Sequence, residues 1–266
     1  MANCIFSKLE KLTSLEVCFD PKGFEKRSLR WLESIIYEKI QNLTSLCFDL
    51  DKCAIQWQRF RILCDLVFSK TRNLQRFFLH LNSSGVTKND LTALIDSLNP
   101  FHRNLECFTL GLANNRVTDD EIEKVFEMIQ SMKALKDLQL ILSRTSITNK
   151  SLKKFGESVL PHLQALDSFE LCVKKTSVSN KGILPILRNL PNLKRLELYL
   201  SDTRITNKAV NVFLEDVLPR LKSLESLTFA ANKTQISNKN FEKIRDVSES
   251  LKKKKQVMVD EILDSE

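Results

Sequence analysis

The feature that most constrains the fold is an apolar block that recurs along the chain about every 31 residues. Each block starts at an anchor leucine, and apolar residues follow at the third, fifth and seventh positions after it. The anchors of repeats 1 to 8 are Leu12, Leu43, Leu74, Leu105, Leu135, Leu166, Leu193 and Leu224. Their spacings are 31, 31, 31, 30, 31, 27 and 31 residues. A period of this length predicts an array of stacked units, each of which contacts mainly its neighbours.

The segment Asn192–Phe213 contains one complete unit of this pattern. Leu196, Leu198 and Leu200 alternate with other residues, which predicts a strand with one buried face. After Thr206 the apolar residues follow a helical spacing. Each unit is therefore expected to form a strand, a tight turn and a helix.

Two polar columns mark the predicted turn. The tenth position after the anchor holds a small polar residue in seven of eight repeats, and we expect it to bond the backbone of nearby turns. Lys22 is the exception in repeat 1. In repeats 3 to 8 a serine or threonine stands at the thirteenth position, where it is expected to cap the helix. Thr118 and Glu121 have the spacing of a capping box.

Repeat 6 is four residues shorter than its neighbours, and the deletion falls in its helical half. We expect one helical turn to be missing there, and Gly182 and Pro185 to weaken that helix further.

The block of alternating leucines, followed by a polar turn and a capped helix, resembles leucine-rich repeats. The period near 31 is similar to the ribonuclease-inhibitor-like subclass, and the turns of the type Ile205-Thr206-Asn207-Lys208 look like repeat proteins of ciliates and other protists. The resemblance extends from Leu12 to about Ile244. It implies an α/β fold: a right-handed solenoid, or horseshoe, of about eight strand–helix repeats with a parallel sheet on its concave face.

One solenoid is expected over residues 1–250, with residues 251–266 as a C-terminal capping segment or tail. Val257 and Val259 alternate as in a ninth strand, and Lys252–Lys255 are expected to form a solvated face. Neither a signal peptide nor an 18-residue apolar run occurs in the sequence, so we expect a cytoplasmic protein without a membrane partner. The seven cysteines contain no Cys-x-x-Cys pair and are expected to be reduced.

The residues between the apolar strand positions should line the concave groove. At the fourth, sixth and eighth positions after the anchors, 24 residues include six carboxylates and only one cation, Lys174, so their formal charge is −5 while the whole chain carries +8. Such a groove should repel nucleic acid and prefer a protein with a basic or mixed surface. The basic remainder of the molecule is expected to favour an acidic surface.

Eight groove residues are predicted to bind the partner. Large apolar groups at exposed positions serve as anchors, and carboxylates form acidic contacts. The eight are Asp49, Asp51, Phe78, His80, Ile141, Glu170, Glu197 and Tyr199.

No enzyme is predicted. The three histidines lack ligand spacing for a metal, no phosphate-binding glycine loop is present, and we expect no cofactor and no small-molecule substrate. Cys47 or Cys172 beside His80 would need a cysteine-protease geometry for which the sequence gives no support.

The function expected from these features is a non-catalytic protein–protein interaction scaffold, acting through the acidic groove, the basic opposite face, or both. The resemblance to protist repeat proteins implies a subunit of a cytoskeletal or ciliary assembly. A GTPase activator of the Ran type is the alternative, because such proteins share this repeat subclass. A ubiquitin-ligase receptor would need an N-terminal F-box, for which repeats that begin at Leu12 leave no room.

Overall fold

A computed structural model describes residues 12–20, 42–100 and 102–255. Its strands form one parallel sheet in which every strand pairs with its sequence neighbour. The strands are β1 (Ser14–Cys18), β2 (Ser45–Asp49), β3 (Arg76–His80), β4 (Cys107–Gly111), β5 (Asp137–Ile141), β6 (Ser168–Cys172), β7 (Arg195–Tyr199) and β8 (Ser226–Ala230).

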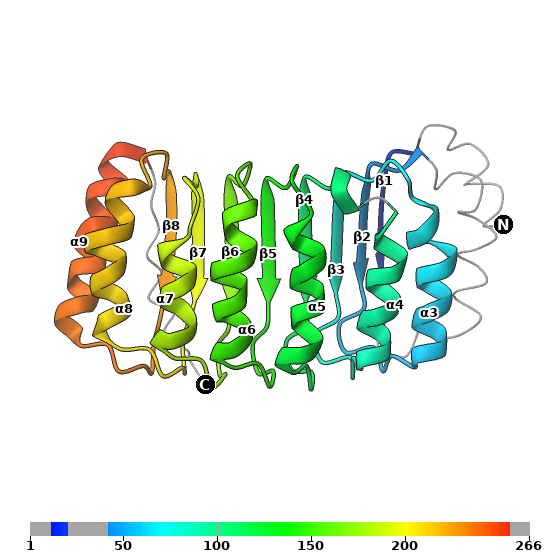
Figure 1. Ribbon diagram of the computed structural model, residues 1–266, viewed down its shortest axis with the longest axis horizontal. Coiled ribbons are helices and arrows are strands. Elements are labelled where there is room, and N and C mark those ends of the chain that lie inside the picture. The colour runs from blue at the N-terminus through cyan, green and yellow to red at the C-terminus, as the bar shows by residue number, and fades with distance from the viewer. Residues whose placement is uncertain (1–11, 21–41, 101, 256–266) are drawn as a thin grey trace.

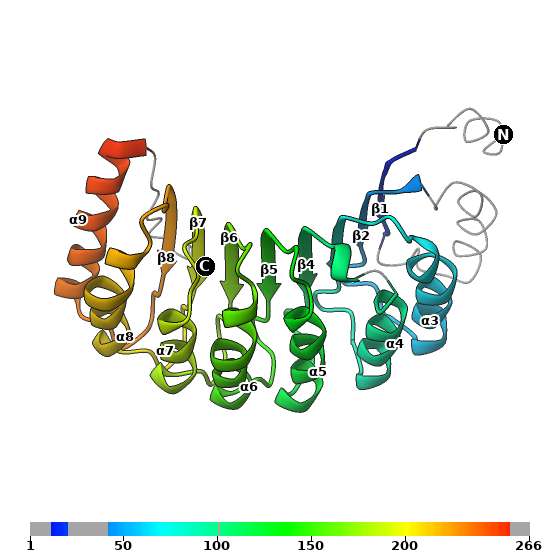
Figure 2. The ribbon, with the colours of Figure 1, turned by 45° about the horizontal axis from the view of Figure 1, so that its top comes forward.

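Helices follow the strands and cover one face of this sheet. The α-helices are α3 (Trp57–Leu66), α4 (Lys88–Leu98), α5 (Asp119–Gln130), α6 (Asn149–Lys154), α7 (Asn180–Arg188), α8 (Asn207–Val212) and α9 (Asn238–Lys255). Short 3-10 helices lie at η2 (Phe68–Lys70), η3 (His102–Asn104), η5 (Leu160–His162) and η7 (Leu218–Arg220), and π-helices at η4 (Phe155–Val159) and η6 (Phe213–Val217). Figures 1 and 2 show the strands side by side along one layer, with the helices on the outside of a curved array. The predicted α/β leucine-rich-repeat solenoid is confirmed.

The anchor repeat sets the register of the sheet. Each strand begins two residues after its anchor leucine, and adjacent strands pair without a shift, as in Leu196 opposite Leu227. The predicted apolar columns are buried from repeat 2 to repeat 8, and they form one continuous core with the inner faces of the helices. In repeat 1, Leu15 and Val17 are only partly buried because β1 is an outer strand of the sheet.

Phenylalanine rings connect successive repeats inside the core. Phe155 lies 4.7 Å from Phe126 and 5.9 Å from Phe169, measured between ring centroids, so one side chain joins three repeats. Phe48, Phe68 and Phe77 make a similar chain of contacts near the N-terminal end.

The polar turn columns behave as predicted. Thr145, Thr176 and Thr203 donate their hydroxyl hydrogens to the backbone carbonyl three residues earlier, just after the end of each strand. Asn115 reaches back to the Leu81 carbonyl of the preceding repeat at 2.8 Å. The capping box of Thr118 and Glu121 is confirmed.

Repeat 6 lacks the extra helical turn of its neighbours. α7 ends at Arg188 with no short helix after it, whereas α6 and α8 each continue through a π-helix and a 3-10 helix. The predicted loss of a turn is therefore confirmed. Gly156 allows the backbone of α7 to approach closely, because a Cβ atom at this position would lie 2.5 Å from backbone atoms of Pro185 and Ile186.

At the C-terminal end, α9 continues to Lys255, so it includes the backbone of Lys252–Lys255. The predicted ninth strand at Val257 and Val259 lies outside the described residues, as do Lys22 and Phe24 of repeat 1.

Candidate concave binding face

The candidate site is the concave face of the sheet, to which every second strand residue contributes. The strands begin at the second position after each anchor, so this face has one more column than the sequence interpretation gave it. The added column is Ser14, Ser45, Arg76, Cys107, Asp137, Ser168, Arg195 and Ser226. Two arginines and one aspartate in it change the formal charge of the concave positions from −5 to −4. The face remains acidic.

The eighth-position column is part of the turns rather than of the strands, because each strand ends at the sixth position. Asp51 shows what this column does. Its two carboxylate oxygens accept hydrogen bonds from the backbone and side-chain nitrogens of Asn82, at 2.7 and 3.0 Å. The side chain of Asn82 in turn accepts from the backbone of Ala113 at 2.7 Å. Asp51 therefore links repeats together, which leaves it less available to a partner than predicted.

The eight predicted binding residues fall into two groups that are separated by β4. Asp49, Asp51, Phe78 and His80 lie on β2 and β3 or just after them, and Ile141, Glu170, Glu197 and Tyr199 lie on β5 to β7. All eight are partly buried. Between the groups, β4 presents buried Thr109 and Gly111.

The first group is partly occupied by contacts within the chain. The Asp49 carboxylate accepts a hydrogen bond from the backbone of Asp51 at 3.0 Å. The guanidinium of Arg76 stands 5.6 Å from the centre of the Phe78 ring, on the same strand. This cation–π contact covers part of the predicted apolar anchor.

The second group is built around Arg195. Its guanidinium lies 3.6 Å from Asp137 and 3.6 Å from Glu197, and it donates to the Ser168 hydroxyl at 3.0 Å. The hydroxyl of Tyr199 donates to the second oxygen of Glu197 at 2.7 Å. Arg195 and Tyr199 thereby hold Glu197 in one orientation on β7.

Glu170 has no comparable support. It stands opposite Glu197 in the strand register, and it makes no hydrogen bond or salt bridge within the ranges that the structure describes. Burial, and then the charge of Glu197, raises the pKa of Glu170 above its usual range. Burial likewise raises the pKa of Asp137, although Arg195 opposes that shift. Three carboxylates thus share one guanidinium, and Glu170 lacks a cation of its own.

The aromatic member of this group is also held in place. The ammonium of Lys174 lies 5.1 Å from the centre of the Tyr199 ring. Burial, and then the hydrogen bond to Glu197, raises the pKa of Tyr199, so the phenol remains a hydrogen-bond donor at neutral pH.

The sequence interpretation missed Arg76, Asp137 and Arg195. The signal was present, because the second position has the same strand parity as the fourth and the sixth. The alternation was counted from the third position, one residue after the true strand start, so the first groove column was placed at the fourth position instead of the second.

In the described part of the chain, the cysteines of the groove lack the properties of a catalytic nucleophile. Burial, and then the charge of Glu16, raises the pKa of Cys47 to about 11, and burial also raises that of Cys172. A nucleophilic cysteine needs the opposite shift. Among the residues described, no group of three or more histidines, cysteines or carboxylates is arranged to hold a metal ion. No helix within these ranges is both long and apolar enough to cross a membrane.

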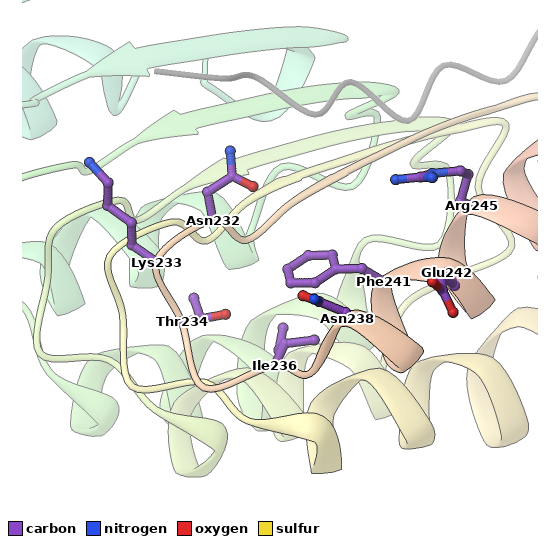
Figure 3. A pocket seen from close by; sticks show the side chains of 8 residues that line it. All are labelled: Asn232, Lys233, Thr234, Ile236, Asn238, Phe241, Glu242 and Arg245. Atoms are coloured by element: carbon purple, nitrogen blue, oxygen red, sulfur yellow. The ribbon is translucent and has the colours of Figure 1, made fainter. Parts of the chain in front are cut away.

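A hollow of about 540 Å³ lies at the C-terminal end of the array, beside the turn that leads from β8 into α9. Figure 3 shows Phe241 directed into it above Ile236, with Glu242 and Arg245 on α9 to one side. Its lining mixes apolar groups with charges of both signs and contains no histidine or cysteine.

No protein-family model matches this chain, and no curated protein matches its sequence. Among solved structures, internalin C2 of Listeria monocytogenes is similar to it, with 20% sequence identity and a TM-score of 0.41. The match covers 76% of this chain and 68% of the internalin. At that identity and TM-score the likeness is not a basis for assigning function.

Proposed function

We propose that this chain is a non-catalytic scaffold that binds another protein through the concave face of β5 to β7, where Glu170 takes up a cationic side chain of the partner. The observation that carries the proposal is the half-buried Glu170 carboxylate, which has carboxylate neighbours and no cation of its own. An arginine or lysine from a partner would relieve this repulsion and would be strengthened by the partial burial.

The neighbouring side chains fit the same role. Arg195 and Tyr199 fix Glu197 in position, so one acceptor is already oriented before a partner arrives. Ile141 on β5 supplies a partly buried apolar surface one strand away from Cys172 and two from Tyr199. Carboxylates beside an apolar side chain offer both the charge and the contact area that a basic side chain of a partner protein can use.

The test is capture of partners from the native source with the immobilised full-length chain, compared with the double variant Glu170→Lys, Glu197→Lys. We expect the variant to fail to capture the proteins that the parent protein retains. We also expect an arginine-rich synthetic peptide to bind the variant at least about tenfold more weakly than the parent protein. The matched control is Asp96→Lys, Glu215→Lys, which makes the same change of charge at exposed positions outside the sheet. Equal loss in both double variants, or no loss in either, contradicts the proposal.

The cytoskeletal or ciliary setting and the cytoplasmic location remain predictions from the sequence and its resemblance. The Ran-type alternative also remains a prediction. Stimulated GTP hydrolysis by a small GTPase in the presence of this protein would favour that alternative over a passive scaffold.

A further inference from the structure

The turns of repeats 5 to 8 gather an excess of positive charge on one edge of the solenoid. We call the segments 143–150, 174–181, 201–208 and 232–239 the basic edge. They contain nine cations and one carboxylate, Asp202, so their formal charge of +8 equals that of the whole chain. The nine are Arg144, Lys150, Lys174, Lys175, Lys181, Arg204, Lys208, Lys233 and Lys239. The equivalent segments of repeats 2 to 4 are 51–58, 82–89 and 113–120, and they hold three cations and three carboxylates.

Three of these cations occupy a backbone conformation that favours other residues. Arg144, Lys175 and Lys233 have φ values of 53°, 56° and 55°, in the left-handed region. Asparagine and glycine adopt this region most readily, and repeat 4 has Asn114 at the equivalent position with φ of 56°. A long cation at this position is not explained by local backbone preference.

Four more cations stand where the helix dipole disfavours them. Lys150, Lys181, Lys208 and Lys239 are each the second residue of a helix, near its positive end. By contrast, α5 in repeat 4 begins with three carboxylates, as the dipole favours. All four repeats therefore depart from the helix-dipole preference, and repeats 5, 6 and 8 also depart from the backbone preference, whereas repeat 7 has Asp202 at the left-handed position.

The hydrogen bonds between repeats do not require this charge pattern. In repeat 4, the Asp119 carboxylate accepts from the backbone N–H of Thr148 at 2.8 Å. Asn149 and Asn207 accept in the same way from Ser179 and Ser237, each at 2.8 Å. Because aspartate and asparagine both perform this role, the amides in repeats 5 to 7 keep carboxylates off the edge at no cost to the fold.

Most of these cations are not used by the fold itself. Within the described ranges, Lys150 pairs with Asp120 at 2.7 Å and Lys174 contacts the Tyr199 ring, while the other seven form no salt bridge and are exposed. Backbone hydrogen bonds join successive turns, for example from Arg144 to Lys174 at 2.9 Å and from Lys175 to Ser201 at 3.0 Å. The cations therefore recur on successive turns across four repeats, with a lateral step of about 5 Å at the sheet.

We propose that the basic edge binds an acidic polypeptide segment of a partner protein. Cations that recur on successive turns fit an extended chain, whose alternate side chains recur about every 7 Å on one face. Glu170 and Glu197 lie on β6 and β7, which lead into these turns, so a nucleic-acid duplex or an anionic membrane that extended onto the concave face would be repelled by them. None of the four segments contains an aromatic residue, so the stacking that single-stranded nucleic acid needs is missing.

The left-handed positions allow a test that removes charge without damaging the fold. The edge variant is Arg144→Asn, Lys175→Asn, Lys233→Asn, and asparagine suits the observed φ values at all three sites. The control variant is Arg103→Asn, Lys133→Asn, Lys222→Asn, which removes three exposed cations from the connections that lead into the strands. The probes are a labelled synthetic peptide of alternating glutamate and serine, a single-stranded oligothymidine and vesicles that contain phosphatidylserine.

We expect the peptide to bind the full-length parent protein. The edge variant should weaken that binding at least about tenfold, and the control variant less than about twofold. The edge variant should also melt no lower than the parent protein. No peptide binding, or equal loss in the two variants, overturns the proposal. Oligothymidine or vesicles that bind more tightly than the peptide, and that depend on the edge residues, overturn the choice of a polypeptide partner. Neither result depends on Glu170, so this proposal and the concave-face proposal can fail separately.

Discussion

At the scale of single residues, asparagine side chains join neighbouring repeats. The Asn149 side chain accepts from the backbone N–H and the hydroxyl of Ser179, at 2.8 and 3.2 Å. Asn180 accepts from the Thr206 backbone N–H at 3.1 Å and donates to the Thr206 hydroxyl oxygen at 2.7 Å. These contacts cross from one helix start to the next, where backbone N–H groups lack a partner within their own helix. A side chain of repeat n therefore satisfies the first turn of repeat n+1.

Replacing Asn149 separates the role of the acceptor from that of the amide. Asn149→Ala should lower the free energy of unfolding by about 1–2 kcal/mol, because the Ser179 N–H loses its acceptor. Asn149→Asp should leave it unchanged or slightly higher, since an oxygen remains and a carboxylate suits a helix start. Urea denaturation of both variants checks this. An aspartate as harmful as alanine would show that the acceptor is not what matters.

Glu170 gives a pH-dependent prediction at the same scale. Its pKa is raised in the folded protein, so the folded state holds the proton more tightly than the unfolded chain does. The stability contribution of this proton is present at low pH and is lost as pH rises through the raised pKa. Glu170→Gln should therefore unfold at a higher urea concentration than the parent protein at pH 7. The difference should be at most about 1 kcal/mol, because solvent screens a carboxylate that is only partly buried.

The control for this prediction is pH itself. Below the usual glutamate pKa of about 4.3, the parent side chain is protonated in both states, and the two proteins should unfold alike. A parent protein that is more stable than Glu170→Gln at pH 7 would mean that Glu170 already has a cationic partner within the chain.

At the scale of elements, the repeat columns predicted the strands well. Apolar alternation sets strand register directly, so the seven pairings of the eight strands followed from the anchors. The start of each strand was set one residue late, so the column at the second position, with Arg76, Asp137 and Arg195, was missed. The π-helices η4 and η6 were not predicted either, because Phe155 and Val159 become buried together only when neighbouring helices pack against them.

Gly156 in η4 is a test of this helix packing. An alanine is normally better than glycine inside a helix by about 1 kcal/mol. Here the added carbon would meet backbone atoms of Pro185 and Ile186 at 2.5 Å. Gly156→Ala should therefore lower the free energy of unfolding by about 1–3 kcal/mol, although alanine has the higher helix propensity. Thermal unfolding monitored by circular dichroism measures this. Ser158→Ala, an exposed change in the same helix, is the control, and a stabilised Gly156→Ala would refute the close approach.

At the scale of the whole molecule, the solenoid divides charge between two surfaces. The strand positions of the concave face carry −3 and the basic edge +8, although both are built from the same repeats. The sequence predicted the acidic groove, because strand alternation assigns residues to a face. It could not place the positive charge, since that required knowing which turns lie side by side. A partner that carries both basic and acidic segments would be oriented by this arrangement.

Stability should also be distributed along the array, because each repeat contacts only its neighbours. The Phe155 ring packs against the rings of Phe126 and Phe169 and so joins repeats 4, 5 and 6. Phe155→Ala should lower the free energy of unfolding by about 3–5 kcal/mol and weaken the contact between the two halves of the solenoid.

Both tryptophans, Trp31 and Trp57, belong to repeats 1 and 2, so their fluorescence reports on the N-terminal half alone. Circular dichroism reports on all repeats. In the parent protein the two urea transitions should coincide, and in Phe155→Ala they should separate. Coincident transitions in the variant, at lower urea, would instead mean that cooperativity extends through the array without this side chain.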